Sequence, residues 1–488
     1  MKEAAERDTV LEGVLDEFAG LAAIPRPSGH EKAVSNYLKK RLTELGFTVV
    51  QDEYKNIIAD KAATPGCEKA PLTILQGHMD MVCVAEDGYD YNPEIDPIKL
   101  QRGDTYLEAE GTSLGGDDGI GVSVAIYAML HAKEHGPLRL IVTVDEECGM
   151  TGAINLDAKY LTDAAYLINC DSEDYDELTI GSAGSVDLTF RRPMKQVEPT
   201  GTRAWTIQVG GLLGGHSGAE IDKERGNAVR TLALILLALQ ERGTIELNLF
   251  TGGKAHNAIP DTALAEIVTD LPLADLQAVI DGQKQHFHDV YGDADPDLTV
   301  DLTPVEMPAT VIQAGDTQRL LRLLTVLHTG IYAMSTAVPG LVATSANLGV
   351  VRMMKNHDAV VEFFPRSSSD EKIEEFCTLA AIVGQMTGFA PEIGTQSPGW
   401  KENKDSRLAQ IMSDVFAKQN GRPMKVGAIH AGLECGWHFE KNPKLDMVST
   451  GVTAIDIHSP QEKIVLATIR PQVELIEETL REIASLEA

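Results

Sequence analysis

The feature that most constrains the fold is a set of short, continuously apolar segments in the first third of the chain. Three of them are "PLTIL" (71–75), "LRLIVTV" (138–144) and "AAYLIN" (164–169). An apolar run without alternation is typical of a strand that is buried on both faces. A segment with helical character, "IGVSVAIYAMLHAKEHG" (120–136), lies between the first two runs. We therefore expect an α/β domain in which helices cover a mixed sheet.

The pattern changes near Gly184, where apolar and polar residues begin to alternate, as in "SVDLTFRRP" (185–193). Alternation predicts antiparallel strands with one face exposed. From there to about residue 395, strands and helices follow one order twice, including helices at 219–240 and 317–333. This order favours an α+β domain with helices on one face of its sheet, which can be read as a doubled module.

The last part of the chain returns to the first pattern. The strand-like "KLDMVSTG" (444–451) precedes a final helix (462–486). At 488 residues the chain is too long for one compact core, so two domains are expected. We predict one α/β domain built from residues 1–186 and 395–488, interrupted by an α+β domain at 187–394.

The composition excludes several classes of partner. A formal net charge of −31 disfavours nucleic acid and anionic membrane surfaces, since phosphate neutralisation needs clustered Lys and Arg. The longest apolar run, "TLALILLAL" (231–239), is about half of the roughly 18 to 20 residues that a membrane span needs. The charged N-terminus does not resemble a signal peptide, and six cysteines without CxxC spacing favour free thiols. We expect a cytoplasmic protein without nucleic-acid or membrane partners.

Polar residues that can bind metal follow the predicted strands or open the helix after them. They occur in "GHMD", "GGDDG", "DEECG", "NCDSED" and "DIHSPQEK". In open α/β sheets the carboxyl ends of the strands line the ligand crevice, so these clusters can converge. Two imidazoles and several carboxylates suit a pair of Zn²⁺ or Mn²⁺ ions that share one bridging carboxylate. The residues that fill this set are His78, Asp117, Glu147, Asp171 and His458.

Each cluster also has a simpler interpretation. A His-x-Asp motif after a strand can be a local hydrogen-bonded pair, and the paired aspartates can cap the following helix. "SPQE" (459–462) reads as a capping box with Pro at the first helical position, so that His458 would only precede a helix. Together these interpretations require five independent coincidences at one edge of one domain. The metal site is therefore the favoured hypothesis.

These strings, in this order, resemble the M20 family of cocatalytic zinc peptidases, and within it the aminoacyl-histidine (Xaa-His, or cytosol non-specific) dipeptidase branch. The likeness spans nearly the full chain. It runs through "IPRPSGHE", "GHMDMV", "LGGDDGIG", "EECGMTGA", "INCDSED", "GLLGGHSGAEI", "GGKAHNAIP", "AIHAGLECG" and "HSPQEK". No single string is specific, but the combination is.

The resemblance implies a catalytic domain, 1–186 with 395–488, and an inserted lid and dimerisation domain at 187–394. It implies that Asp117 is the carboxylate shared by the two metal ions. The family often has Asn after this aspartate, whereas this chain has Asp118, so the bridging residue is either Asp117, which we favour, or Asp118. The five implied ligands are those named above: His78, Asp117, Glu147, Asp171 and His458.

Three further residues have roles that the resemblance implies. Asp80 would orient His78 without touching metal. Glu146 would be the general base that takes the proton of a metal-bridged water and delivers it to the leaving amine. His216, in "GGHSG", would donate to the developing oxyanion, from the same subunit or from the partner of a homodimer.

Contacts to substrate are implied for Asn257 in "HNAIP", Arg366 in "FFPRSSS" and His430 in "AIHAGLECG". An arginine fork suits the terminal carboxylate of a dipeptide and would measure its length. Glu434 lies in the same loop as His430, and its role is left open.

The expected activity is hydrolysis of dipeptides, of the Xaa-His type with broad specificity, by two divalent metal ions. Zn²⁺ is the expected metal, with Mn²⁺ and Co²⁺ as alternatives. Another M20 amidohydrolase, such as an acyl-amino-acid deacylase or a tripeptidase, is the first alternative function. A metal-binding homologue without activity is the second, which an intact Glu146 disfavours because a base that is not a ligand has no structural duty.

Overall fold

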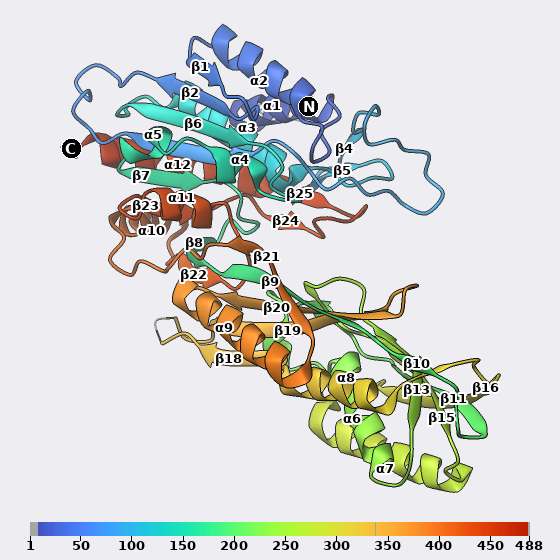
Figure 1. The fold of residues 1–488 in the computed structure, drawn as a ribbon. Coiled ribbons are helices and arrows are strands. Elements are labelled where there is room, and N and C mark those ends of the chain that lie inside the picture. The colour runs from blue at the N-terminus through green and yellow to red at the C-terminus, as the bar shows by residue number, and fades with distance from the viewer. Residues whose placement is uncertain (1–7, 337, 487–488) are drawn as a thin grey trace. The chain divides into compact units, whose positions relative to one another are not determined.

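The computed structural model describes residues 8–336 and 338–486 and divides the chain into two compact units. The first unit consists of Met1–Gly181, Glu402–Ala428 and Leu433–Ala488. The second consists of Ser182–Lys401 and Ile429–Gly432. Residues from both ends of the chain, blue and red in Figure 1, therefore build the first unit, as an inserted-domain organisation requires.

A mixed eight-stranded sheet organises the first unit. Its central strand β3 runs parallel to β6 on one side and to β7 on the other, and β7 runs parallel to β23. The pairs β1–β2, β2–β6 and β23–β8 are antiparallel. In spatial order the strands are β1 (Thr48–Gln51), β2 (Ile57–Lys61), β6 (Leu138–Thr143), β3 (Thr73–His78), β7 (Tyr166–Asn169), β23 (Asp446–Ser449), β8 (Glu177–Ser182) and β22 (Lys425–Ile429).

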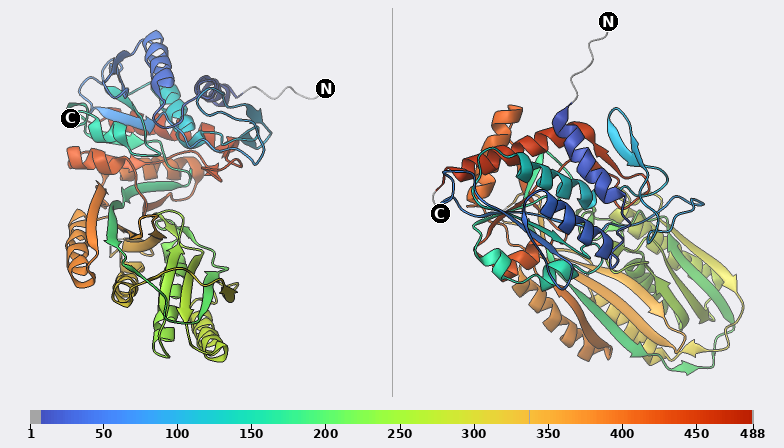
Figure 2. Two further views of the ribbon diagram at one scale, coloured as in Figure 1. Left: turned by 45° about the vertical axis from the view of Figure 1, so that its right-hand side comes forward. Right: turned by 90° about the horizontal axis from the view of Figure 1, so that it is seen from above.

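Helices cover both faces of this sheet, which explains why its central strands are apolar throughout. In Figures 1 and 2 one group of helices lies in front of the strands and another group behind them. The front group is α4 (Thr151–Asn155), α5 (Lys159–Thr162) and α11 (Cys435–Lys441). The back group includes α1 (Thr9–Ala22), α3 (Gly116–His131) and α12 (Ile469–Ala484), while α2 (Lys32–Glu44) packs on β1 and β2 and α10 (Arg407–Asn420) packs on α12. Every residue of β3 and β6 is buried as a result.

The sequence analysis predicts that the C-terminal helix begins at residue 462, and this predicted start is wrong. Residues there form β25 (Lys463–Val465), which pairs with β24 (Ala454–Ile455) and β5 (Tyr106–Ala109) in a small sheet completed by β4 (Leu100–Arg102). A 3₁₀ turn, η2 (Leu466–Thr468), leads into α12. The capping box is absent because the Glu462 carboxylate accepts backbone N–H groups of the distant segment 114–117.

A nine-stranded antiparallel sheet organises the second unit. In spatial order its strands are β16 (Thr299–Val305), β11 (Arg203–Gly210), β15 (Ala263–Thr269), β13 (Glu246–Gly252), β19 (Val342–Met353), β20 (Asp358–Ser367), β9 (Gly184–Pro193) and β21 (Ala390–Ser397), with β18 (Gly330–Met334) on β19. Two short pairs accompany it, β10 (Gln196–Val197) with β17 (Val311–Ile312), and β12 (Gly215–His216) with β14 (Ala258–Ile259). Alternating burial along β9 matches the alternation in its sequence.

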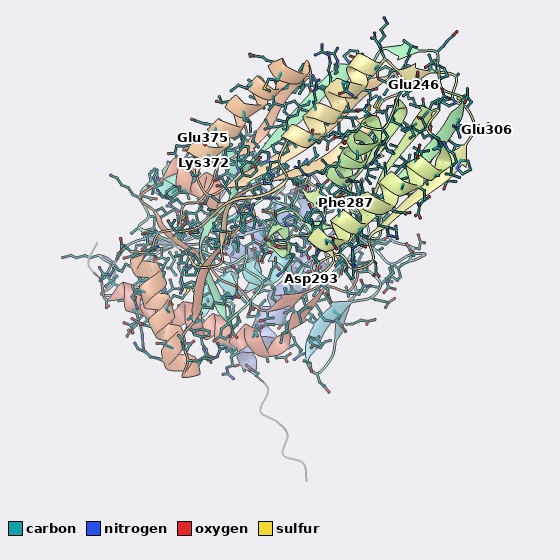
Figure 3. All side chains as sticks on the ribbon, turned by 90° about the horizontal axis from the view of Figure 1, so that it is seen from below. Glu246, Phe287, Asp293, Glu306, Lys372 and Glu375 are labelled. Carbon is teal, nitrogen blue, oxygen red and sulfur yellow. The ribbon has the colours of Figure 1, made fainter. Side chains whose placement is uncertain are left out.

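Four helices lie together along this sheet in Figure 1: α6 (Ala228–Gln240), α7 (Leu273–Tyr291), α8 (Ala314–Val326) and α9 (Asp370–Thr387). Figure 3 labels residues of two of these helices. Phe287 of α7 packs into the core, while Lys372 and Glu375 of α9 form an exposed ion pair of 2.7 Å. In the described part of the chain no helix is long and apolar enough to cross a membrane.

Two predicted helices of this unit are longer in the sequence analysis than in the structure. The helix predicted at 317–333 ends at Val326, because Leu327 is already extended, with a φ of −67° and a ψ of 99°, and β18 begins at Gly330. The helix predicted at 219–240 begins at Ala228, where the Asn227 side chain accepts the N–H of Arg230 as an N-cap.

Candidate metal centre

The parallel strands β3, β6 and β7 bring three polar clusters to one edge of the first sheet. His78 is the last residue of β3 and pairs in register with Thr143 at the end of β6. Glu146 and Glu147 follow β6, and Asp171 follows β7. The carboxyl ends of parallel neighbours must meet at one edge, so these side chains converge.

Two further segments complete the cluster from outside the strands. Asp117 stands at the start of α3, which packs on β3. His458 lies in the connection between β24 and β25 and adopts a left-handed backbone with a φ of 57°. Such a φ is costly for a non-glycine residue and is found where the surrounding structure enforces it, often at functional sites.

Each of the two histidines faces carboxylate oxygens through its Nε2 atom. The Nε2 of His78 lies 3.0 Å from Asp117 Oδ1 and 3.3 Å from Asp171 Oδ1. The Nε2 of His458 lies 3.1 Å from Asp117 Oδ2 and 3.0 Å from Glu147 Oε2. Asp117 therefore directs one carboxylate oxygen to each histidine, which is the arrangement of a carboxylate that bridges two cations.

The electrostatics of this cluster call for a cation. Burial alone would lower the pKa of His78, but Asp171 and Asp117 raise it well above its usual value. Burial, together with the neighbouring Asp117, raises the pKa of Asp171 well above the ordinary carboxyl range. These directions mark a buried site with more negative charge than two imidazoles neutralise, and divalent cations offset such charge. The donor set of imidazole nitrogens and carboxylate oxygens fits Zn²⁺ or Mn²⁺.

Asp118 follows Asp117 through a cis peptide bond, and its side chain has different partners. Its buried carboxylate accepts the backbone N–H of His78 at 3.3 Å. Burial and the nearby Asp171 raise its pKa well above the usual carboxyl value. Three sets of residues bring possible ligand atoms within 4.8 Å of one another in the described chain, and none includes Asp118: His78–Glu146–Glu147, His78–Asp117–Asp171 and Asp117–Glu147–His458.

Asp80 lies on the other side of the His78 ring. Its Oδ1 is 3.4 Å from His78 Nδ1, the nitrogen that faces away from Asp117 and Asp171. The same carboxylate accepts the backbone N–H groups of Glu146 at 3.1 Å and Glu147 at 3.2 Å. Asp80 thus lies beside the His78 ring and also holds the segment after β6 through two backbone hydrogen bonds.

Glu146 belongs to the cluster but to neither of the sets that contain Asp117. Burial raises the pKa of its carboxyl well above the usual value, and the carboxylates of Asp171 and Glu147 act in the same direction. A carboxylate in such surroundings readily accepts a proton, which is the property required of a general base.

Two polar neighbours of the cluster were not identified from the sequence, or were left without a role. Ser28 donates from Oγ to Asp80 at 2.8 Å. Glu434 is fully buried and accepts hydrogen bonds of 2.6 Å from Gln76 Nε2 and Thr143 Oγ1, and burial raises its pKa to about 7. The available signal was their position inside the strings "IPRPSGHE" and "AIHAGLECG".

The second unit contains a different polar cluster around Arg366 on β20. The Arg366 side chain is buried, and its guanidinium lies over the Phe364 ring at 4.7 Å. Burial lowers its pKa to about 10, although the charge of Asp187 acts in the opposite direction, and among the described residues no carboxylate lies within ion-pair distance of it. A buried cation without an ionic partner is costly unless an anion binds to it.

His216 and Asn257 lie beside each other in the same unit. His216 pairs with Ala258 across β12 and β14, and the Asn257 carbonyl accepts the N–H of Ser217 at 2.8 Å. The Nδ1 of His216 accepts the N–H of Ala219 at 3.1 Å, which favours the neutral tautomer with its proton on Nε2. The Nε2 also lies 3.4 Å from Arg366 Nη2, and because a guanidinium can only donate, this contact favours the opposite tautomer.

His430 also belongs to the second unit, and its Nε2 lies 2.7 Å from Ser345 Oγ. Burial, and then the charge of Arg366, lower its pKa to about 3. The imidazole is therefore neutral at physiological pH. The structure brings the sequence-predicted residues together in two groups, one in each unit.

Comparisons with known proteins agree with this geometry. The model of "Peptidase family M20/M25/M40" matches residues 74–482. The chain is 32% identical to the "Cytosol non-specific dipeptidase" of Escherichia coli (strain K12), over 96% of this chain and 97% of that protein. The crystal structure of an aminoacylhistidine dipeptidase from Vibrio alginolyticus matches with a TM-score of 0.86, 32% identity and 96% coverage of both chains.

More distant structures share the fold alone. Aminopeptidase PepT from Bacillus cereus ATCC 10987 matches with a TM-score of 0.57 and 18% identity, over 97% of this chain and 99% of that chain. The family match spans most of the sequence, and the histidine–carboxylate cluster lies within it. The chain therefore belongs to peptidase family M20/M25/M40 and has the fold of a hydrolase of that family.

Proposed function

We propose that this hydrolase is a dipeptidase with two divalent metal ions. His78 and Asp171 would hold one ion, Glu147 and His458 the other, and Asp117 would bridge both. The observation that carries this proposal is that the two oxygens of Asp117 lie within 3.1 Å of two different histidine Nε2 atoms. Zn²⁺ is the metal we propose, with Mn²⁺ and Co²⁺ as alternatives that fit the same donors.

When bound, such ions would polarise the scissile carbonyl and make water nucleophilic near neutral pH. Glu146 would accept the proton of the attacking water and deliver it to the leaving amine, since a single carboxylate can serve in both steps. Asp80 would keep the His78 ring in position and also fix the backbone of Glu146 and Glu147 through their N–H groups. The base and the metal ligands would thus be set by one carboxylate.

The second unit would bind the substrate. Arg366 would pair with the terminal carboxylate of the dipeptide, which supplies the anion that this buried guanidinium lacks. His216 would donate from Nε2 to the oxyanion that develops on the scissile carbonyl, in the tautomer that the Ala219 hydrogen bond supports. Asn257 and the neutral His430 would contact the peptide through polar groups. We propose that this unit is a lid, and that the enzyme is a homodimer.

The substrate class we propose is unblocked dipeptides of the Xaa-His type, with broad specificity. Support comes from the relatives, one named a cytosol non-specific dipeptidase and the other an aminoacylhistidine dipeptidase, at 32% identity each. The former name also supports a location in the cytoplasm.

The test is hydrolysis of a substrate panel by protein that has been stripped of metal and then supplied with Zn²⁺, Mn²⁺ or Co²⁺. The panel contains Xaa-His and other dipeptides, tripeptides, and N-acetyl amino acids. We expect turnover of dipeptides only after metal is restored, with two ions per chain by elemental analysis. Faster turnover of N-acetyl amino acids or tripeptides than of any dipeptide would refute the proposed substrate class.

A further inference from the structure

Near the proposed metal cluster are two buried charged residues that have no role in the proposed chemistry. Arg26 precedes α2 and is 1% exposed, and Glu462 precedes β25 and is 3% exposed. Both lie in the first unit, more than four hundred residues apart in the sequence. Both side chains form hydrogen bonds with backbone groups, and these groups belong to the segments that carry the proposed metal ligands.

Arg26 holds the end of β3 to the start of α3. Its Nη1 donates to the carbonyl oxygens of Met79 at 3.0 Å and Asp80 at 2.9 Å, the two residues after His78. Its Nη2 donates to the carbonyl of Gly115 at 2.5 Å, two residues before Asp117. The planar fork of an arginine suits such a divided set of acceptors, whereas a lysine ammonium could not reach all three.

Glu462 holds the same loop from the other side. Its Oε2 accepts the N–H groups of Leu114 at 2.8 Å and Gly115 at 3.0 Å. Its Oε1 accepts those of Gly116 at 2.7 Å and Asp117 at 3.3 Å. Four consecutive backbone donors thus converge on one carboxylate four residues after His458. An anionic acceptor makes such hydrogen bonds stronger than neutral ones.

Both side chains bind the backbone of the same residue, Gly115. Glu462 binds its N–H and Arg26 binds its carbonyl oxygen. Gly115 adopts a φ of 67°, and a Cβ there would lie 2.5 Å from Arg26 Nη2 and from Met81 Sδ. The backbone at Gly115 therefore lies against Arg26 and Met81 so closely that a side chain would not fit there.

We infer that Arg26 and Glu462 are positioning residues that set the distances between Asp117 and the two histidine ligands. Arg26 fixes the spacing between His78 and Asp117, and Glu462 fixes the spacing between His458 and Asp117. The inference rests on the proposed pair of metal ions. Each positioning residue then governs the affinity of one ion: Arg26 that of the ion held with His78, and Glu462 that of the ion held with His458.

The test measures stepwise Zn²⁺ binding to metal-free protein by competition with a chromophoric chelator. Glu462→Gln replaces one acceptor oxygen by a donor that faces N–H groups, and Arg26→Lys loses the fork but keeps the charge. Changing groups that orient metal ligands typically lowers metal affinity about 10- to 100-fold. We expect a loss of that size for one ion in each variant, with the affinity for the other ion changed by less than about 3-fold.

Ligand variants identify which ion is affected. In a His458→Ala background only the ion at His78 remains, so Arg26→Lys should weaken it about 10-fold or more and Glu462→Gln should not. In a His78→Ala background the two effects should be exchanged. A purely structural role would weaken both ions equally in both backgrounds, and this result would overturn the inference.

Arg139 provides the matched control. It is also a mostly buried arginine of the same sheet, bound to Asp60 and Asp163 at 2.7 Å and to the Tyr160 carbonyl at 2.8 Å. Arg139→Lys should destabilise the metal-free protein without changing either Zn²⁺ affinity. If Glu462→Gln does not fold, Glu462→Asp keeps the charge on a shorter side chain and should weaken the His458 ion to a smaller extent.

The outcomes separate the inference from the proposed function. Wild-type protein that binds fewer than two Zn²⁺ ions refutes both. Wild-type protein that binds two ions, with unchanged affinities in Arg26→Lys and Glu462→Gln, refutes the positioning roles alone and leaves the dipeptidase proposal intact.

Discussion

The first unit gathers carboxylates around two imidazoles, whereas the second unit buries an arginine that has no carboxylate ion pair in the described chain. The first cluster has an excess of negative charge and calls for cations. The second calls for an anion. The two units therefore have opposite electrostatic requirements.

The two clusters also differ in how they are built. In the first unit the side chains come from strand ends and loops that Asp80, Arg26 and Glu462 tie together through backbone groups. In the second, Arg366 is the second-last residue of strand β20, and its guanidinium lies over the Phe364 ring of the same strand. We infer that the first cluster depends on accurate distances between its side chains. The second depends mainly on a positive charge that is buried away from water.

Removal of metal should produce the largest effect and should fall on the first unit alone. With a chelator we expect activity to fall at least about ten-thousand-fold, since metal ions at such sites supply several kcal/mol of transition-state stabilisation. Hydrogen–deuterium exchange should increase at the ends of β3, β6 and β7, while β19 and β20 keep their protection. Equal loss of protection in both units would contradict the separation, and re-addition of Zn²⁺ is the control for reversibility.

Glu146→Gln should have the next largest effect. We expect kcat to fall about 10²- to 10⁴-fold, the usual contribution of a general base, with KM changed by less than about 3-fold. Elemental analysis should find the metal content of wild type, because Glu146 is not a proposed ligand. A variant that keeps a tenth of the wild-type kcat would exclude the proposed base.

Arg366→Lys tests the anion requirement of the second unit. The loss of a paired, charge-assisted hydrogen bond should lower kcat/KM for dipeptides about 10- to 100-fold. Dipeptide amides, which lack the terminal carboxylate, should be hydrolysed equally by wild type and variant. The control is Arg352→Lys, because Arg352 lies in the same sheet but is 49% exposed and pairs with Glu362. An equal loss for acids and amides would show that Arg366 does not bind the carboxylate.

The smallest predicted effect is a pH dependence that distinguishes the two units through two buried histidines. Burial lowers the pKa of His430 in the second unit, and of His438 in the first, to about 3. The unfolded chain binds protons with a pKa of about 6.5, so it gains protons first as the pH falls. The stability contribution is therefore complete above about pH 6.5 and is lost progressively toward pH 3, by about 2 kcal/mol at pH 5 for each histidine.

Urea unfolding at pH 7.5 and pH 5.0 measures this contribution. His430→Gln and His438→Gln should each lose less stability between the two pH values than wild type does. If the units unfold in separate transitions, each variant should alter only the transition of its own unit. An unchanged pH dependence in both variants would show that neither imidazole is kept neutral by burial.

Much of the first unit could be predicted because its signal is local. Continuous apolarity identified β3, β6 and β7, and strand direction then placed His78, Glu147 and Asp171 at one edge. The boundaries failed where long-range contacts override local preference. Residues 459–462 have the local pattern of a capping box, but the Glu462 carboxylate is used by N–H groups more than three hundred residues away.

Arg26 and Glu434 show a second limit of prediction from one sequence. Each is a charged residue in an otherwise unremarkable loop or turn, and its partners are distant in the chain. Neither periodicity nor spacing indicates that such a side chain will be buried, since charged residues are mostly exposed. The sequence analysis favours Asp117 over Asp118 through the family resemblance alone. The structure adds a physical difference, because Asp117 lies beside His458 whereas Asp118 accepts the backbone N–H of His78.

The division of the chain also bears on how the protein is made. The second unit is complete at Gly432, whereas β23, His458 and α12 of the first unit come later. Domains generally fold in the order in which they leave the ribosome, but here the earliest residues must wait for the latest. A nascent chain can therefore finish its second unit while one histidine of the proposed metal pair has not yet been synthesised. Capture of both ions would then be among the last events of maturation.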